Sequence, residues 1–259
     1  MGYPDKVISL LELLFESESN GWLLRQQQDP EKVVFDVGHL KSLKTTNEVY
    51  HYLYKFTGAA RMENDKFQFK YLGDGSSRAV YDMGNGNVLK VAHSTVKTNT
   101  RQNRKEVNVW ECTGGSPLLT GVVDYDNSKF LWLVAEKADR TFGEFSKSHE
   151  AAQKQTAECL NQMNKSFGLK INKLTSQEQL SYVAELLVHK LVTKKQQPTD
   201  REENLDINNM AEEIIKNGIN KWTLELIKLM KVCKLDSLDF WCQNMGIKNG
   251  KLVFVDYGW

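Results

Sequence analysis

The feature that most restricts the fold is a change of hydrophobic spacing between residues 67 and 138. Phe67, Phe69 and Tyr71 alternate with polar residues, as the residues of a half-buried strand do. A polar helical segment at 98–110 follows the third strand of this region. The pattern predicts a five-stranded antiparallel sheet with one inserted helix, and its other strands are expected at 80–81, 88–92, 118–123 and 130–136.

Helical spacing flanks the predicted sheet on both sides. Residues 4 to 62 are expected to form helices, with Thr46 able to cap one of them. Residues 140 to 233 are also helical in pattern and include one long segment from 205 to 232. The fold class is therefore α+β. The expected domains are an accessory helical extension at 1–62, a sheet lobe at 63–138 and a helical lobe at 139–259.

Charge and cysteine content exclude several classes of protein. The 259-residue chain has a formal net charge of +1, which gives no general electrostatic case for binding nucleic acid or a membrane surface. No apolar run approaches the roughly 18 residues that a membrane-spanning helix needs. The four cysteines form no CxxC pair, so buried reduced thiols are expected rather than zinc ligands or a disulfide framework. We expect a soluble, cytoplasmic protein.

A glycine-containing turn lies between the first two predicted strands. Glycines allow backbone N–H groups to approach phosphate oxygens without interference from Cβ atoms. The turn is neither a Walker loop, because no Gly-Lys-Ser/Thr follows, nor a dinucleotide fingerprint, because a strand comes next. A plain hairpin turn is the alternative. The residues expected to bind a phosphate-bearing ligand here are Gly73, Gly75, Ser76, Arg78 and Val80.

Lys90 occupies the middle of the third predicted strand. Burying a lysine is costly unless its ammonium group meets an anion. Glu106, on the inserted helix, is the expected partner, with Glu111 as a competitor one turn later. The alternative is an outward-facing lysine on a half-exposed strand, with both glutamates on a solvated helix face.

Three oxygen-bearing side chains are spaced along the end of the chain. Asn244 follows Asp239 by five positions, and Asp256 comes twelve positions later, within Asp256-Tyr257-Gly258. Asp239 can orient a hydroxyl group or accept its proton. Asn244 and Asp256 offer the hard oxygen ligands that Mg²⁺ prefers. Any one of these residues alone would be ordinary on a protein surface.

In this order, the motifs resemble those of the protein-kinase-like superfamily. The resemblance implies a two-lobed fold with Lys90, Glu106 and Asp239 as catalytic residues and Asn244 and Asp256 as metal ligands. It also places residues 136–138 where the family's hinge binds adenine, so Glu136 and Ala138 are expected to contact the adenine ring. The implied cofactors are ATP and Mg²⁺.

The sequence departs from the family pattern at several positions. Arg78 stands in place of the third glycine, Ser237-Leu238 in place of His-Arg, and Trp241 in place of a lysine. The sequence ends at Trp259, before the activation segment of a protein kinase, so a minimal helical C-lobe is expected. In these respects the chain also resembles small kinase-like proteins of tailed bacteriophages, which would place it in a host cytoplasm.

The resemblance implies an ATP-dependent phosphotransferase that acts on a protein Ser/Thr hydroxyl. A small-molecule or nucleic-acid hydroxyl is the other acceptor to consider. The alternative is a pseudokinase, a nucleotide-binding or protein-binding module that transfers nothing. Transfer of the AMP group of ATP, with Arg78 in contact with a phosphate, is a third hypothesis.

Overall fold

The structure is a computed structural model that describes residues 35–57, 69–142, 149–170, 176–188, 190–191, 203–235 and 241–257. The chain divides into two compact units, Met1–Val37 and Gly38–Trp259. The second unit contains all the predicted strands and site residues, and the description below concerns that unit. The predicted domain boundary near residue 62 lies outside the described residues.

Five strands form one antiparallel sheet in the order β1-β2-β3-β5-β4. Their bounds are β1 (Lys70–Asp74), β2 (Arg78–Asp82), β3 (Asn87–Ala92), β4 (Val122–Tyr125) and β5 (Trp132–Glu136). The central strand, β3, is buried over its last five residues because it has neighbours on both edges. The predicted fold class, α+β with a five-stranded antiparallel sheet, is confirmed.

One prediction about this sheet is wrong in position. The run 118–123 was expected to be a strand of the sheet, but β4 begins at Val122. Leu118 and Thr120 instead exchange backbone hydrogen bonds with Phe254, at N···O distances of 2.7 and 3.0 Å. The apolar run therefore joins the end of the chain to the sheet rather than extending the sheet itself.

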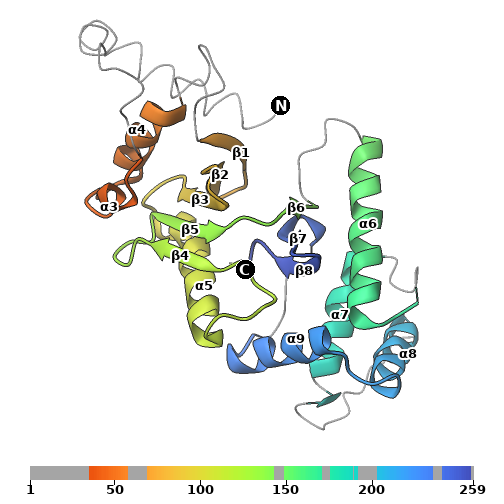
Figure 1. The fold of residues 1–259 in the computed structure, drawn as a ribbon. Coiled ribbons are helices and arrows are strands. Elements are labelled where there is room, and N and C mark those ends of the chain that lie inside the picture. The colour runs from red at the N-terminus through yellow and green to blue at the C-terminus, as the bar shows by residue number, and fades with distance from the viewer. Residues whose placement is uncertain are drawn as a thin grey trace, which may run out of the picture. The chain divides into compact units, whose positions relative to one another are not determined.

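Helix α5 (Lys97–Thr113) follows β3 and packs on one face of the sheet (Figure 1). Its buried positions recur every three or four residues, as a helix face requires, but several of them are polar. The buried residues are Thr100, Asn103, Glu106, Val107 and Val109. A helix that buries polar side chains must provide partners for them, and this one does so at the candidate site.

Among the described residues, two helices precede the sheet, α3 (Val37–Leu40) and α4 (Thr46–Thr57). Thr45, not Thr46 as predicted, caps α4. Its hydroxyl accepts from the N–H of Glu48, and the Glu48 carboxylate accepts from the N–H of Thr45. Tyr50 of α4 donates to the carbonyl of Val91 at 3.3 Å, so α4 braces the strand that carries Lys90.

In the part of the chain that the structure describes, four longer helices follow the sheet: α6 (His149–Phe167), α7 (Gln177–Val188), α8 (Glu203–Lys216) and α9 (Lys221–Val232). The predicted continuous helix from 205 to 232 is wrong. Gly218, at φ 87°, breaks the segment, and Asn220 caps α9 by accepting from the N–H of Thr223 at 2.9 Å. Val183, Met163 and Leu226 belong to the core that these helices share.

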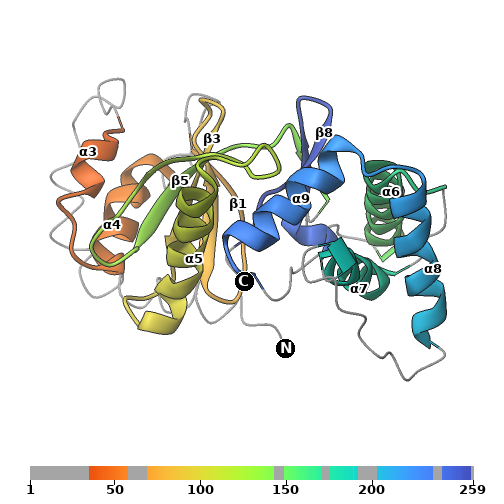
Figure 2. The ribbon, with the colours of Figure 1, turned by 90° about the horizontal axis from the view of Figure 1, so that it is seen from below.

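The described end of the chain runs through the 3₁₀ turn η4 (Cys242–Asn244), β7 (Met245–Lys248) and β8 (Lys251–Phe254), and β7 pairs with β6 (Arg140–Thr141) to form a short second sheet. The β7–β8 hairpin closes through Asn249 and Gly250, both at positive φ, as the turn chemistry predicts. In both ribbon views it lies between the five-stranded sheet and α6 (Figures 1 and 2). This position brings the last described residues to the sheet.

The four cysteines form two disulfides, Cys112–Cys233 and Cys159–Cys242. The expectation of reduced thiols is therefore wrong, because residues far apart in sequence meet in the fold. The first bridge joins the end of α5 to the end of α9, and the second joins α6 to η4. Among the described residues, no helix combines the length and apolar character needed to cross a membrane.

Candidate functional site

Lys90 is buried in the middle of the sheet, with 4% of its surface exposed. Strand β3 places it opposite Val80 of β2 and Leu133 of β5. Its Nζ donates to both carboxylate oxygens of Glu106, at 3.0 and 2.9 Å, and to the carbonyl of Val255 at 2.5 Å. The alternative of an outward-facing lysine is therefore wrong.

Glu106 is completely buried on the inner face of α5. Besides Lys90, its carboxylate accepts from Arg78 and, at 3.4 Å, from the backbone N–H of Tyr257. The competing residue, Glu111, is exposed and accepts from the hydroxyl of Tyr125. The fold thus selects Glu106, because position 106 lies on the face of α5 that packs on the sheet and position 111 does not.

Arg78 lies in β2 rather than in the glycine turn, and only 3% of it is exposed. Its guanidinium donates to Asn103 at 3.0 Å and forms ion pairs with Glu106 and with Asp256, the latter at 2.9 Å. A guanidinium can serve three partners at once because its donors project in a planar fork. Arg78 therefore connects the sheet, α5 and the end of the chain.

Asp256 reaches this cluster from the segment after β8. In addition to the ion pair with Arg78, both of its carboxylate oxygens accept from the amide group of Gln102, at 3.1 and 3.0 Å. Its side chain is 30% exposed, unlike the buried Glu106. Lys90, Arg78, Glu106 and Asp256 are called the charged cluster below, and they hold two positive and two negative groups.

Asn244 lies next to Asp256 although twelve residues separate them. Its backbone carbonyl accepts from the N–H groups of Val255 and Asp256, at 2.8 and 3.2 Å. Tyr257 is fully buried and donates from its hydroxyl to the carbonyl of Thr120 at 2.6 Å, which anchors the end of the chain. Asp239, the predicted catalytic acid, and Gly258 lie outside the described residues.

The turn between β1 and β2 contacts His93, the residue after β3, and its backbone is held at both ends. The N–H of Gly75 donates to the carbonyl of Arg78 at 2.9 Å, and His93 Nε2 lies 2.9 Å from the carbonyl oxygen of Gly75. Ser76 and Gly75 are exposed, and a Cβ atom added to Gly75 would meet nothing within 4 Å. Gly73 and Val80 lie in the paired strands and are partly buried. The open side of the turn leaves space for a ligand.

The predicted hinge follows β5. The side chain of Glu136 is already engaged, since it accepts from the N–H of Gly121 at 2.7 Å and forms an ion pair with Lys248. These contacts lower the pKa of Glu136, the Lys248 hydrogen bond most strongly. Ala138 is buried. Binding of a ligand by Glu136 and Ala138 stays a prediction.

Burial and neighbouring charges shift the pKa values of the two buried cations in opposite directions. Burial lowers the pKa of Lys90, and the nearby Arg78 adds to that effect, against the opposing influence of Glu106. Burial also acts to lower the pKa of Arg78, but Asp256 and Glu106 outweigh it and raise the pKa overall. Arg78 therefore stays protonated beside Asp256 and Glu106.

Sequence reasoning missed Gln102 and Asn103, which hold Asp256 and Arg78. Asn103 is fully buried and also donates to the carbonyl of Phe130 at 2.9 Å. Their spacing offered one signal: positions 102, 103 and 106 share a helix face with few apolar residues. Without a partner for that face, however, the spacing is equally typical of a solvated surface.

The donor set at Asp256 and Asn244 fits a hard divalent cation. The backbone hydrogen bond between Asn244 and Asp256 makes the two residues neighbours, one carrying an amide and the other a carboxylate, and Mg²⁺ usually takes its other ligands from water and phosphate oxygens. Within the described residues, no group of three His, Cys, Asp or Glu side chains is arranged to hold a metal ion.

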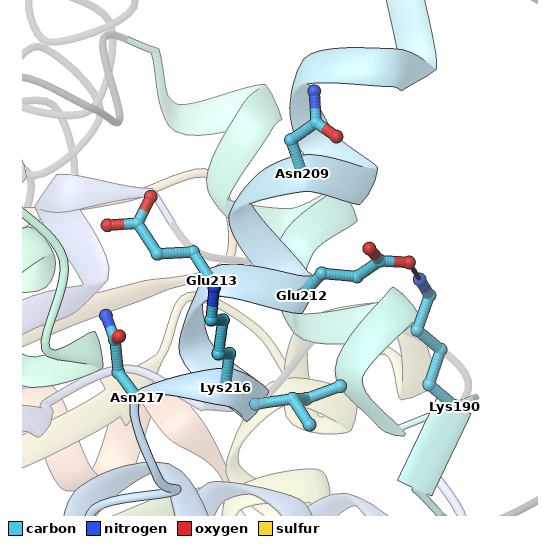
Figure 3. A pocket seen from close by; sticks show the side chains of 7 residues that line it. Lys190, Asn209, Glu212, Glu213, Lys216 and Asn217 are labelled. Carbon is cyan, nitrogen blue, oxygen red and sulfur yellow. Dashed lines mark hydrogen bonds and ion pairs between the residues drawn. The ribbon is translucent and has the colours of Figure 1, made fainter.

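A surface hollow of about 610 Å³ lies elsewhere, along α8 (Figure 3). Glu212, Glu213 and Lys216 of α8 line it, and Glu212 pairs with Lys190 at 2.9 Å. None of its lining residues belongs to the charged cluster. The candidate site is therefore defined by its chemistry rather than by the size of this hollow.

No protein-family model and no curated protein matches the chain. Among solved structures it is similar to APH(2'')-IIa in a ternary complex with streptomycin and ATP, at 17% identity and a TM-score of 0.32, over 87% of this chain and 71% of that one.

Two further solved structures are similar to the chain at the same level. One is APH(2'')-IIa in a complex with gentamicin, at 15% identity and a TM-score of 0.34, over 87% of this chain and 71% of that one. The other is the aminoglycoside phosphotransferase APH(2'')-Ib with ADP bound, at 16% identity and a TM-score of 0.33, over 82% and 70%.

Proposed function

We propose that this chain is an ATP-dependent phosphotransferase of the protein-kinase-like type. The observation that supports this most is the contact between Lys90 and Glu106, both buried, in a cluster that Asp256 joins from the end of the chain. Burying Lys90, Arg78 and Glu106 is expensive in free energy, and replacing buried ion pairs with apolar residues often costs nothing. Such clusters are typical of sites where a charged ligand is bound.

In this proposal, ATP binds beneath the turn between β1 and β2. The backbone N–H of the exposed Ser76 contacts a phosphate oxygen, and Lys90, oriented by Glu106, neutralises phosphate charge. Asn244 and Asp256 hold the metal. When bound, Mg²⁺ supplies further neutralisation of the phosphate charge.

The transfer step needs an acceptor hydroxyl in line with the γ-phosphate. A bond forms between the acceptor oxygen and the γ-phosphorus while the bond from that phosphorus to the bridging oxygen of ADP breaks. Asp239 takes the proton of the hydroxyl in this proposal. Our first choice of acceptor is a protein Ser/Thr hydroxyl, and a small-molecule hydroxyl is the second.

One observation favours a binding module without transfer activity. Lys90 and Asp256 are both engaged by groups of the chain itself. Lys90 donates to Glu106 and Val255, whereas Asp256 accepts from Arg78 and Gln102. A site whose charges are already satisfied can hold a protein together without binding a nucleotide. Measurements of binding and of transfer are therefore needed separately.

The binding experiment is a thermal-shift titration with ATP in the presence and absence of Mg²⁺. We expect Mg²⁺-dependent stabilisation of the wild type that Lys90→Met removes. Lys228→Met is the matched control, because Lys228 is an exposed helical lysine paired with Glu225 on α9. If Lys90→Met responds to Mg²⁺ and ATP as the wild type does, the nucleotide site is not at the charged cluster.

The transfer experiment is mass spectrometry of the protein and of trial acceptors after incubation with Mg²⁺ and ATP. Added phosphoryl mass that Asp256→Asn abolishes is the expected result. Added nucleotide mass would indicate transfer of the AMP group instead. Stabilisation by ATP without transfer to any acceptor would support the binding module.

A further inference from the structure

Arg78 is the member of the charged cluster whose role the proposed function leaves open. Asp256, the proposed metal ligand, is already paired with a cation, since Arg78 Nη2 lies 2.9 Å from its Oδ1. Gln102 occupies the same carboxylate with two uncharged hydrogen bonds. The carboxylate oxygens that a metal ion needs are therefore those that Arg78 and Gln102 now hold.

A metal ion on Asp256 would lie close to a guanidinium that has little room to withdraw. Arg78 is 3% exposed, and Asn103 and Glu106 fix its other donors. The metal ion and the guanidinium would be two positive charges on the same carboxylate, and like charges so close together in a partly buried site repel strongly. A polyphosphate would relieve that repulsion, because it supplies anionic oxygens to both cations.

We propose that Arg78 is a positioning residue that acts as the internal counter-cation of Asp256, suppressing binding of a divalent cation alone and making it depend on the nucleotide. This inference rests on the proposed function, because it takes Asp256 as the metal ligand. In the empty site, Arg78 balances the charge of Asp256. In the loaded site, the phosphates take over part of the guanidinium's hydrogen bonding. The residue thus couples the two ligands instead of merely stabilising the fold.

The experiment measures binding of Mn²⁺, without nucleotide, by calorimetry or electron paramagnetic resonance. Arg78→Gln removes the charge and keeps hydrogen-bonding capacity. We expect it to tighten Mn²⁺ binding by about tenfold or more, because a like-charge contact of this kind is worth at least that factor. In the wild type, Mn²⁺ and ATP together should stabilise the protein by more than the sum of their separate effects. We expect this excess to be smaller in Arg78→Gln.

Gln102→Ala is the matched control, since it removes two hydrogen bonds to Asp256 but no charge. We expect Mn²⁺ affinity to change by less than about threefold in this variant, because the repelling guanidinium remains. Equal tightening in Gln102→Ala and Arg78→Gln would show that free carboxylate oxygens, not charge, matter, and would overturn the proposal.

Arg78→Lys guards against a variant that fails to fold. It keeps the charge, but one ammonium group cannot serve Glu106 and Asp256 with the geometry of a fork. We expect tighter Mn²⁺ binding than in the wild type and weaker binding than in Arg78→Gln. Unchanged or weaker binding in both Arg78 variants would mean that Arg78 only orients Asp256, and the inference would be wrong.

Asp256→Asn separates this inference from the proposed function. If the wild type or Arg78→Gln binds Mn²⁺ and Asp256→Asn does not, the metal site is real and the comparison of affinities decides the role of Arg78. If no protein shows Mn²⁺ binding that depends on Asp256, with or without ATP, both the metal site and the inference fail.

Discussion

Replacing Glu106 with glutamine should destabilise the fold far more than an ordinary helix substitution does. The glutamate is completely buried and holds two cations, with Lys90 Nζ at 3.0 and 2.9 Å and an ion pair to Arg78. Removing one partner of a buried ion pair typically costs about 3–5 kcal/mol, because the other charge is left uncompensated. The amide oxygen of glutamine keeps one hydrogen bond, worth about 1 kcal/mol. We therefore expect a loss of about 3 kcal/mol.

Urea unfolding followed by circular dichroism measures this loss. With a typical dependence of about 1–3 kcal/mol per molar urea, the midpoint should fall by about 1 M or more at an unchanged slope. Glu111→Gln is the control on the same helix, since Glu111 is exposed, and its effect should stay within about 0.5 kcal/mol.

A double-mutant cycle tests the physical reason. In Lys90→Met/Glu106→Gln the unpaired ammonium is gone, so the two changes together should cost at least about 1 kcal/mol less than their sum. If Glu106→Gln costs no more than Glu111→Gln, or if the cycle shows no coupling, the buried charge pair does not stabilise the fold as reasoned here.

Three further predictions follow from single contacts. Gly246→Ala should lower the free energy of unfolding by about 1–3 kcal/mol in a denaturant titration, because the new Cβ would lie 2.6 Å from the backbone oxygen of Arg140. Burial acts to raise the pKa of Asp126, but hydrogen bonds from Ser128 and from backbone N–H groups outweigh it and lower the pKa. The stability that Asp126 contributes is thus present above its unfolded pKa of about 3.9 and lost as pH falls through the lower folded value, so Asp126→Asn should flatten the acid limb of a stability–pH curve. Replacing Cys112 and Cys233 together by serine should cost about 2–4 kcal/mol under oxidising conditions, and a reductant that leaves the wild-type melting temperature unchanged would show that the bridges do not contribute.

Local patterns were sufficient for most of the sheet. The alternation around Tyr71 and the apolar run of β3 each depend on neighbours in sequence, and the structure contains both strands. The errors arose where a local pattern had two solutions. The run at 118–120 is apolar enough for a strand, yet it pairs with Phe254 instead of with the sheet.

The choice among site residues shows the same division. The buried position of Lys90 could be predicted, because a lysine between valines and leucines must find an anion. Glu106 was the expected partner and the structure pairs it with Lys90, but only the packing of α5 excludes the competing Glu111. Arg78 was assigned to the glycine turn, whereas strand pairing turns its side chain inward.

By itself, the amino-acid sequence determined the order of sheet and helices, the burial of a lysine in the third strand and the presence of two acids and an amide near the end of the chain. These features depend on periodicity and on the cost of burying charge, which are properties of short segments. The tertiary structure alone decided that Arg78 pairs with Asp256, that Gln102 holds the same carboxylate and that the cysteines meet in pairs. The disulfides join residues more than 80 positions apart in the sequence, and the hydrogen bonds between Gln102 and Asp256 join residues more than 150 positions apart. Only the packing of the whole unit brings residues so distant in sequence into contact.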